Sequence, residues 1–433
     1  MKKTVAFHTL GCKVNQYETQ AMEELFLKSG FSIGDFDDFC DVYVINTCTV
    51  TGTGDKKSRQ IIRRCKAINE NAVIAVTGCY SQVSPEEISP LGADVILGNT
   101  DKGKIVEFVN DALCGKKTNA VCDILKCRDF EDMHISDFNE KTRAFVKIED
   151  GCNSFCSYCI IPYARGPVRS RDLKSIVDEV SALSEKGFSE VVLTGIHIAS
   201  YGLDIKDKEI NLGDVINAVS EVEGIKRIRL GSIEPRILTE DFVKNLSLNP
   251  KVCNHFHISL QSGCDETLKR MKRKYDTALF SDVVKNIRKY IPDSAITTDI
   301  MVGFPGETEE EFETSVQFLK DICFAEAHVF AYSNRKGTVA DKLKNQVNRK
   351  DKNQRAKKMA DAAKLCREKF LSGFIGKKVT VLAERQVEDG IYEGHTSNYI
   401  KVHVPSLTDI AKKFVDVEIT RISDDYVEGR ICD

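Results

Sequence analysis

The first quarter of the chain alternates short apolar runs with amphipathic stretches of helical period. Runs rich in β-branched residues lie at residues 3–9, 41–47, 73–77 and 93–97. Apolar positions three and four residues apart follow them, at residues 17–29, 55–69, 86–91 and 104–113. Strands and helices that alternate in this way form a parallel sheet with helices on its faces. We therefore predict an N-terminal domain, residues 1–115, built on an open parallel α/β sheet.

A second and longer alternation fills the middle of the chain, after a linker over residues 116–142. Six β-rich runs lie at residues 144–148, 190–193, 227–230, 255–260, 295–301 and 327–330. Helical patterns separate them, at residues 172–186, 212–222, 240–245, 277–290 and 309–321. This series predicts a partial (β/α)6 barrel over residues 143–333. Its active site is expected at the carboxyl ends of the strands.

The pattern of charged and apolar residues changes in the last hundred residues. Residues 334–370 carry 13 Lys and Arg against 4 Asp and Glu, so we read 334–371 as a basic connector. Short alternating runs joined by polar turns follow, at residues 377–383, 391–395, 399–404, 414–420 and 426–430. They predict a small antiparallel β-barrel of OB-like kind over residues 372–433.

Composition narrows the class of protein. The 433 residues carry a formal net charge of −3, which excludes a global polycation. The apolar stretch at the N-terminus is too short for a signal peptide, and no run approaches the ~18 apolar residues of a membrane span. We expect a cytoplasmic protein, where its 16 cysteines are reduced thiols suited to metal binding or catalysis rather than disulfides.

The run EDGCNSFCSYCIIP carries the strongest chemical signal. Its cysteines, Cys152, Cys156 and Cys159, lie within eight residues and have no obvious fourth partner nearby. Thiolates suit zinc, copper(I) or iron–sulfur clusters. A structural zinc takes four closed ligands, usually as two separated pairs. The triplet therefore favours a four-iron cluster with one iron left open, over zinc or inert core cysteines.

Three more cysteines each follow one of the first three predicted strands: Cys12, Cys48 and Cys79. Ligands of open α/β sheets bind beyond the carboxyl ends of the strands. If these strands are neighbours, the three thiols meet and hold a second cluster. The alternative is that each cysteine is a small buried residue at the end of a strand.

Four segments together resemble the methylthiotransferase family of radical S-adenosylmethionine (SAM) enzymes. They read TLGCKVNQYET, IEDGCNSFCSYCIIPYARGPVRSR, HISLQSGCDETLKRMKRKY and TDIMVGFPGETEEEF. The resemblance covers almost the whole chain, and the closing barrel is similar to a TRAM domain, an RNA-binding module. Within the family, the flanking residues most resemble the type that modifies N6-threonylcarbamoyladenosine beside the tRNA anticodon.

The resemblance implies an enzyme with two [4Fe-4S] clusters and SAM as cofactors. Its reaction is the transfer of a methylthio group to carbon 2 of that nucleoside at tRNA position 37. One SAM methylates a sulfur carried by the cluster at Cys12, Cys48 and Cys79, and another is the radical source. A radical route is reasonable because the ring C–H at carbon 2 is not acidic enough for a side-chain base.

Implied partners are tRNA, a flavodoxin- or ferredoxin-like electron donor and a sulfur donor. The alternatives within the class are the isopentenyladenosine-directed and ribosomal-protein-directed sisters. From another class, the alternative is a non-catalytic iron–sulfur RNA-binding or redox protein.

SAM is expected to bind at the strand ends around the triplet. The candidate residues are Gly195, Ser232, Glu234, Ser259, Gln261 and Val302. Ordinary loop chemistry at strand ends is the alternative for each.

RNA is expected at local basic runs, because residues 373–433 hold 8 basic against 11 acidic residues. The candidates are Lys272, Arg273, Lys352, Arg355, Lys357 and Lys358, with the basic helix at 55–69 as a further surface. Solvated helix faces are the alternative. Arg169 and Arg171 would hold a substrate carboxylate or phosphate, or else form a structural salt bridge. The remaining cysteines show no ligand spacing, although Cys114, Cys122 and Cys127 gather loosely in the linker.

Overall fold

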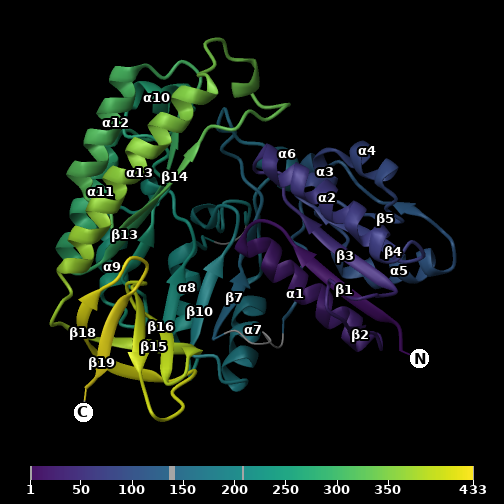
Figure 1. Cartoon of the computed structure of the whole chain (residues 1–433), viewed down its shortest axis with the longest axis horizontal. Coiled ribbons are helices and arrows are strands. Elements are labelled where there is room, and N and C mark those ends of the chain that lie inside the picture. The colour runs from purple at the N-terminus through teal and green to yellow at the C-terminus, as the bar shows by residue number, and fades with distance from the viewer. Residues whose placement is uncertain (1, 136–141, 207–208, 433) are drawn as a thin grey trace.

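The computed structural model describes residues 2–135, 142–206 and 209–432 (Figure 1). Its N-terminal part is a parallel sheet of six strands in the order β2-β1-β3-β4-β5-β6. The strands are β1 (Thr4–Thr9), β2 (Ser32–Ile33), β3 (Val42–Thr47), β4 (Val73–Gly78), β5 (Val95–Ile96) and β6 (Thr118–Asn119). The four predicted strands are confirmed, and two short strands, β2 and β6, extend the edges of the sheet.

Helices cover both faces of this sheet. They are α1 (Lys13–Lys28), α2 (Gly52–Ile68), α3 (Cys79–Val83), α4 (Pro85–Ile88) and α5 (Ile105–Leu113). Met22 and Phe26 of α1 share one hydrophobic core with Ile105 of α5. Ile62 of α2 belongs to the core on the other face. The order β1-β3-β4 makes the first three predicted strands neighbours, which is the condition for Cys12, Cys48 and Cys79 to meet.

The central part is the predicted partial (β/α)6 barrel. Its strands are β7 (Arg143–Lys147), β10 (Glu190–Thr194), β11 (Arg227–Leu230), β12 (His255–His257), β13 (Ala295–Val302) and β14 (Glu326–Ala331). They pair in parallel as β11-β10-β7 and β12-β13-β14, and isolated bridges such as Ile233–Ile258 join the two groups. The strands therefore follow chain order around the barrel. The intervening helices are α7 (Leu173–Glu185), α8 (Leu212–Ser220), α9 (Glu240–Ser247), α11 (Thr277–Tyr290) and α12 (Glu309–Ile322).

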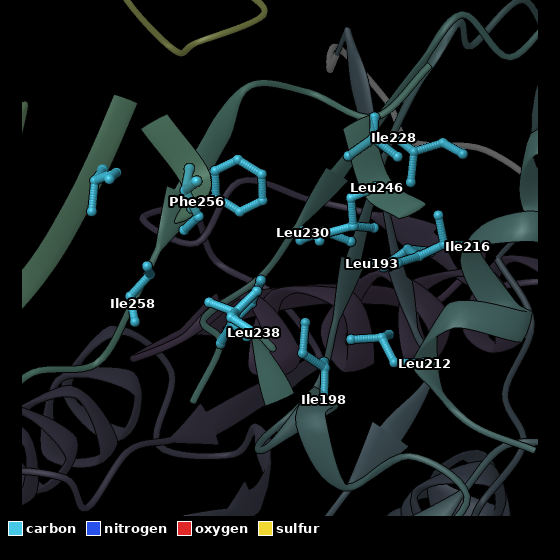
Figure 2. Close-up of a cluster of buried hydrophobic side chains, with 14 of the residues drawn as sticks. Leu193, Ile198, Leu212, Ile216, Ile228, Leu230, Leu238, Leu246, Phe256 and Ile258 are labelled. Carbon is cyan, nitrogen blue, oxygen red and sulfur yellow. The ribbon is translucent and has the colours of Figure 1, made fainter. Parts of the chain in front are cut away.

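An apolar layer between strands and helices holds this barrel together. Figure 2 shows Leu193, Ile228 and Leu230 of the strands beside Ile216 of α8 and Leu246 of α9. Burial of one such side chain contributes about 1.5–3 kcal/mol. Tyr17 and Ala21 of α1 belong to the same core, so the N-terminal domain packs directly on the barrel.

The C-terminal part is a closed five-stranded barrel in the order β15-β16-β17-β19-β18. Its strands are β15 (Lys378–Glu388), β16 (Ile391–Thr396), β17 (Lys401–Pro405), β18 (Phe414–Ile422) and β19 (Val427–Ile431). All pairings are antiparallel except that of β17 with β19, which is parallel. The predicted small OB-like barrel is confirmed; the parallel pairing of β17 with β19 was not predicted, because alternation along a strand carries no information about the direction of its partner.

The basic connector contains a long helix, α13 (Arg349–Ser372). Met359, Ala362 and Cys366 on one face of α13 are buried in the core of the partial barrel. The basic composition therefore belongs largely to the outer face of a packed helix rather than to a free linker. Among the described residues, none of the helices has the length and apolar character needed to cross a membrane.

The five-stranded barrel docks on the amino-terminal end of the partial barrel. Arg227, the first residue of β11, donates to the carbonyls of His395 and Thr380. Tyr399 stacks on His255, the first residue of β12, with ring centroids 4.9 Å apart. The opposite end of the strands, which is nearest the cysteine triplet, is therefore free of the C-terminal barrel.

Candidate metal centres

The first cysteine set lies at the carboxyl edge of the N-terminal sheet. Cys12 is the N-cap residue of α1, Cys48 follows β3, and Cys79 opens α3 directly after β4. Gly11 lies so close to Cys48 that a Cβ there would come within 2.9 Å of its Sγ, and its φ of +102° favours glycine. Because residue 11 is glycine, the end of β1 can approach the end of β3 closely.

Burial acts on the thiols of this set. Burial first, and then the neighbouring thiols Cys79 and Cys12, raise the pKa of Cys48 to about 11. Burial also raises the pKa of Cys12, and Cys79 adds to the effect. These two thiols are therefore protonated at neutral pH without metal, so that metal binding has to release protons.

A guanidinium from the central domain contacts this first set. Arg165 Nε donates to Cys79 Sγ over 3.4 Å, and the Asn99 side-chain amide donates to the same sulfur over 3.5 Å. Arg165 also donates to Asn15 Oδ1 over 2.6 Å. The Asn15 amide in turn donates to the carbonyl of Thr47, the residue before Cys48. Donors aimed at sulfur stabilise a thiolate or a cluster in preference to a neutral thiol.

Arg165 belongs to a buried ionic network that joins two domains. The carboxylates are Glu18 of α1 and Asp150, and the cations in contact with them are Lys102, Lys147, Arg165 and Arg169. These cations lower the pKa of Glu18 well below its usual range, against the effect of burial. Glu131 also acts on Lys102 and Lys147, so three carboxylates face four cations and one positive charge is in excess near Cys79. An anionic group at the first cysteine set offsets that excess, so the residues fit a thiolate-bound cluster.

The second cysteine set lies in the loop between β8 (Glu149–Asp150) and the short helix α6 (Ile161–Arg165). The Cys152 amide donates to the Gly166 carbonyl over 3.0 Å, and the Ser157 amide to the Met271 carbonyl over 3.0 Å. A Cβ at Gly151 would lie 2.0 Å from the Pro167 carbonyl oxygen, so only glycine fits before Cys152. Burial raises the pKa of Cys159 to about 12, and Cys156 and Cys152 add to it.

This second set also has a guanidinium at one sulfur. Arg273 Nη1 donates to Cys156 Sγ over 3.2 Å, and Arg273 Nε donates to Tyr275 OH over 2.8 Å. The Tyr275 hydroxyl donates to the Ser259 carbonyl. Arg273 therefore connects a thiol of the triplet to a strand-end residue predicted to bind SAM.

The predicted SAM residues all lie at the carboxyl ends of the barrel strands. Ser232 Oγ is 3.0 Å from Ser259 Oγ, which joins the ends of β11 and β12. Glu234 accepts from Arg236, and its carboxylate is 3.9 Å from His197 Nε2. Gly195 has no room for a side chain, because a Cβ would lie 2.7 Å from Glu149 Oε2.

The other two predicted SAM residues lie farther along the same rim. Gln261 pairs with β13 through an isolated bridge to Ile300, and Val302 ends β13. The structure thus gathers the six predicted residues along one rim, and among them a side-chain hydrogen bond joins Ser232 to Ser259.

The six predicted RNA residues divide into three pairs. Lys272 and Lys357 are exposed and have no ion-pair partner among the described residues. Lys358 pairs with Glu313, and Lys352 Nζ donates to the Tyr332 carbonyl. The other two, Arg273 and Arg355, are held by protein groups; Arg355 is buried and pairs with Glu307 and Glu309. Neither of these two guanidinium groups is free for a phosphate.

Arg169 and Arg171 are buried and form salt bridges. Arg171 pairs with Glu179 and Asp132, and Arg169 with Asp150. Sequence reasoning missed Arg165, Asn99 and the role of Arg273 beside the triplet. Arg165 lies in the segment RGP, but no sequence signal distinguishes a buried arginine from an exposed one.

Among the described residues, no three His, Cys, Asp or Glu side chains close around the position of a single metal ion. A four-iron cluster binds its thiolates through different irons, so its ligands stand farther apart than those of one ion. The absence of a single-ion site among the described residues is therefore compatible with the binding of a four-iron cluster by each cysteine set.

Two family models match the chain. Residues 146–319 match the radical SAM superfamily, and residues 4–98 match the uncharacterized protein family UPF0004. The likeness to solved structures agrees on the fold. The radical SAM methyltransferase TsrM of Kitasatospora setae has a TM-score of 0.57 at 14% identity, over 76% of this chain and 75% of the other. Fold and triplet define a radical SAM protein.

Similar proteins with assigned names define the kind of radical SAM protein more closely. Threonylcarbamoyladenosine tRNA methylthiotransferase MtaB of Bacillus subtilis is 42% identical, over 99% of this chain and 96% of its own length. The protein of that name from Aquifex aeolicus is 38% identical, over 94% and 98%. A tRNA-2-methylthio-N(6)-dimethylallyladenosine synthase of Clostridium novyi is 34% identical, over 98% and 95%. The chain belongs to the family of radical SAM tRNA methylthiotransferases.

Proposed function

We propose that this chain transfers a methylthio group to carbon 2 of N6-threonylcarbamoyladenosine at position 37 of tRNA. The observation that carries the proposal is the pair of cysteine sets, each with three thiols and each with a guanidinium N–H on one sulfur. Near-full-length similarity to the B. subtilis and A. aeolicus proteins supports the choice of substrate.

The second cysteine set is proposed to hold the SAM-binding [4Fe-4S] cluster through Cys152, Cys156 and Cys159. These three thiolates would hold the cluster, which would supply the binding site and the electron for cleavage of SAM. The chain positions this chemistry: Arg273 holds the Cys156 sulfur, and the hydroxyls of Ser232 and Ser259 present donors at the rim. Glu234 accepts from Arg236 through both carboxylate oxygens, and it is proposed to accept from hydroxyl groups of SAM through the remaining lone pairs of that carboxylate.

The first cysteine set is proposed to hold a second [4Fe-4S] cluster through Cys12, Cys48 and Cys79, which would carry the sulfur to be inserted. Arg165 and Asn99 donate to the Cys79 sulfur and offset negative charge there. The ionic network at Glu18 fixes the N-terminal domain against the central barrel. The radical would form in the central domain, and the sulfur would be carried by the N-terminal domain. Both have to reach carbon 2 of the substrate, so the junction between the two domains has to be rigid.

We further propose tRNA, an electron donor of flavodoxin or ferredoxin type and a sulfur donor as partners, in the cytoplasm. Exposed Lys272 and Lys357 are the proposed phosphate contacts. The domain division 1–115, 116–142, 143–333, 334–371 and 372–433 is retained as a proposal, with residues 136–141 of the linker outside the described part of the chain.

Nucleoside analysis of tRNA tests this proposal. A strain that lacks the gene should lose the methylthio derivative of threonylcarbamoyladenosine and accumulate threonylcarbamoyladenosine itself. Restoring the gene should restore the methylthio derivative. The second candidate, the isopentenyladenosine-directed activity, is favoured by the Clostridium relative. Loss of methylthio-isopentenyladenosine, with methylthio-threonylcarbamoyladenosine unchanged, would establish that candidate instead.

A non-catalytic iron–sulfur protein is tested separately. Anaerobic protein with reconstituted clusters, SAM and dithionite should yield 5′-deoxyadenosine and methionine. A binding protein without turnover yields neither.

A further inference from the structure

Two thiols outside both cysteine sets lie in contact. Cys122 Sγ and Cys127 Sγ are 3.5 Å apart, on either side of the single turn Ile124–Lys126. A disulfide holds its sulfurs about 2.05 Å apart, so a bond requires an approach of only about 1.5 Å. Both side chains are partly accessible to solvent. Small thiol reagents can therefore reach a pair that is already nearly in bonding position.

The turn between the two thiols is anchored to the protein. Ile124 is buried, and its carbonyl oxygen approaches Gly166 so closely that a Cβ there would lie 2.4 Å away. Asp123 accepts from the Leu125 amide over 3.2 Å. An anchored turn keeps the thiols opposed, which favours a bond between them over a bond to a distant cysteine.

The pair also adjoins the first cysteine set. Thr100 Oγ1 is 3.3 Å from Cys122 Sγ, and the preceding residue, Asn99, donates to Cys79 Sγ. Gln82 of α3 donates to the Cys122 carbonyl over 2.8 Å and accepts from the Asn99 amide over 2.9 Å. Gln82 therefore links Cys122 to Asn99, a residue that contacts Cys79.

We infer that Cys122 and Cys127 form a redox site, a dithiol–disulfide couple that reacts by thiol–disulfide exchange with low-molecular-weight disulfides. The Cys122 thiolate attacks one sulfur of the small disulfide, and a small thiolate leaves. Cys127 then loses its proton and attacks the Cys122 sulfur of the mixed disulfide, which releases the second small thiolate. The protein loses two electrons and two protons, and the small disulfide becomes two thiols.

Burial, and then Cys122, raise the pKa of Cys127 to about 11. Cys127 therefore carries its proton at neutral pH and has to lose it before it attacks the mixed disulfide. The site is distinct from the proposed methylthiotransferase chemistry and does not depend on it.

Peptide mapping tests the redox site. Trypsin cleaves after Lys117, Lys126 and Arg128, so a Cys122–Cys127 disulfide joins the peptide 118–126 to the dipeptide 127–128. Full-length reconstituted protein is equilibrated anaerobically with mixtures of glutathione disulfide and glutathione, quenched in acid, alkylated and digested. The linked peptide should rise with the proportion of glutathione disulfide and vanish after excess dithiothreitol.

Matched variants make the result decisive. Cys127→Ser should trap glutathione on Cys122, whereas Cys114→Ser, which removes an exposed cysteine of the same linker, should leave the linked peptide unchanged. The inference is overturned if the wild-type protein shows no linked peptide under conditions that attach glutathione to Cys114. It is equally overturned if glutathione stays on Cys122 of the wild-type protein without passing to the internal disulfide.

Discussion

Arg165 Nε donates a hydrogen bond to Cys79 Sγ over 3.4 Å, which links a buried guanidinium of the central domain to a thiol of the N-terminal domain. The same guanidinium pairs with Glu18 and Asp150. Arg165 therefore serves two purposes, the neutralisation of two buried carboxylates and the stabilisation of charge on sulfur.

Replacement of Arg165 should have separable effects on stability and on redox potential. Arg165→Gln removes the guanidinium's contacts with Glu18 and Asp150, while Lys102, Lys147 and Arg169 still pair with these carboxylates, and should cost about 1.5–3 kcal/mol of unfolding free energy. In a Cys152→Ala/Cys156→Ala/Cys159→Ala background it should also lower the potential of the remaining cluster by on the order of 50 mV, because a nearby positive charge favours the reduced form. Denaturant titration and redox-poised electron paramagnetic resonance measure these effects, and Arg128→Gln is the exposed control. Unchanged stability and potential would remove Arg165 from the first centre.

The ligand assignment predicts how iron divides between the two sets. Reconstituted wild-type protein should bind about eight irons, and Cys48→Ala or Cys156→Ala about four. The variants Cys114→Ala and Cys127→Ala should bind as much iron as the wild-type protein, because neither residue belongs to a ligand set. Iron and acid-labile sulfide per chain measure this directly, and equal iron loss in Cys156→Ala and Cys127→Ala would contradict the assignment.

Lys13 is expected to contact the substrate carboxylate. It follows Cys12, has no carboxylate partner among the described residues, and has a pKa lowered by burial and then by Arg229 and Arg143 of the barrel strands. Lys13 is exposed, and it lies near enough to Arg229 and Arg143 of the barrel strands for their charges to act on its ammonium group. Threonylcarbamoyladenosine carries a carboxylate, whereas isopentenyladenosine carries none.

Lys13→Met should raise KM for a threonylcarbamoyl anticodon stem-loop about tenfold or more, the effect of one charge-assisted hydrogen bond. Esterification of the substrate carboxylate should impair the wild-type enzyme and leave Lys13→Met unaffected. Iron content is measured alongside, since Lys13 adjoins Cys12. If esterification raises KM of Lys13→Met by the same factor as that of the wild-type enzyme, another residue binds the carboxylate.

Exposed lysines should carry the salt-dependent part of RNA binding. Lys272→Ala and Lys357→Ala should each weaken tRNA binding and reduce the slope of log affinity against log salt by about 0.7. Lys285→Ala is the control, on a helix outside the predicted surface. Filter binding at several salt concentrations provides the slopes. Slopes equal to the control would move the RNA surface away from both lysines.

His255 predicts a specific loss of stability in acid. It is buried, stacked on Tyr399, and burial followed by Arg229 lowers its pKa well below 6.5. The unfolded chain takes up a proton near pH 6.5 and the folded chain does not. The His255 contribution to stability is therefore complete above pH 6.5 and is lost below it, by about 1.4 kcal/mol per pH unit down to the folded pKa.

Denaturant midpoints between pH 5 and 8 measure this contribution. His255→Gln, which keeps a polar group near Thr297, should remove that part of the acid slope, whereas His134→Gln at an exposed position should retain it. A slope unchanged in His255→Gln would assign the acid sensitivity to other groups.

Sequence pattern predicted the fold where local periodicity decides it. The strands that precede Cys48 and Cys79 are buried throughout, and their continuous apolar runs mark a parallel sheet; in the strand that precedes Cys12 only Val5 and Ala6 are buried. The pairing of β17 with β19 and the packing of α13 escaped prediction. Both depend on contacts between segments distant in the chain, which composition and period do not encode.

The candidate site shows the same division. Cysteine spacing predicted the triplet Cys152, Cys156 and Cys159, and the placement of one cysteine after each of three neighbouring strands predicted the set Cys12, Cys48 and Cys79. Arg273 and Arg355 were predicted as RNA contacts from their basic neighbourhoods, yet Arg273 contacts Cys156 and Arg355 pairs with Glu307. Burial of a charge depends on a partner elsewhere in the chain, and no local pattern reports it.

Single-turnover analysis of purified protein tests the central claim most directly. Reconstituted wild-type enzyme, SAM, reductant and a threonylcarbamoyl anticodon stem-loop are combined without oxygen, and the nucleosides are analysed by mass spectrometry. The account predicts the 2-methylthio product from wild type, 5′-deoxyadenosine without that product from Cys48→Ala, and neither from Cys156→Ala. Formation of the methylthio product by Cys48→Ala would contradict the two-centre account.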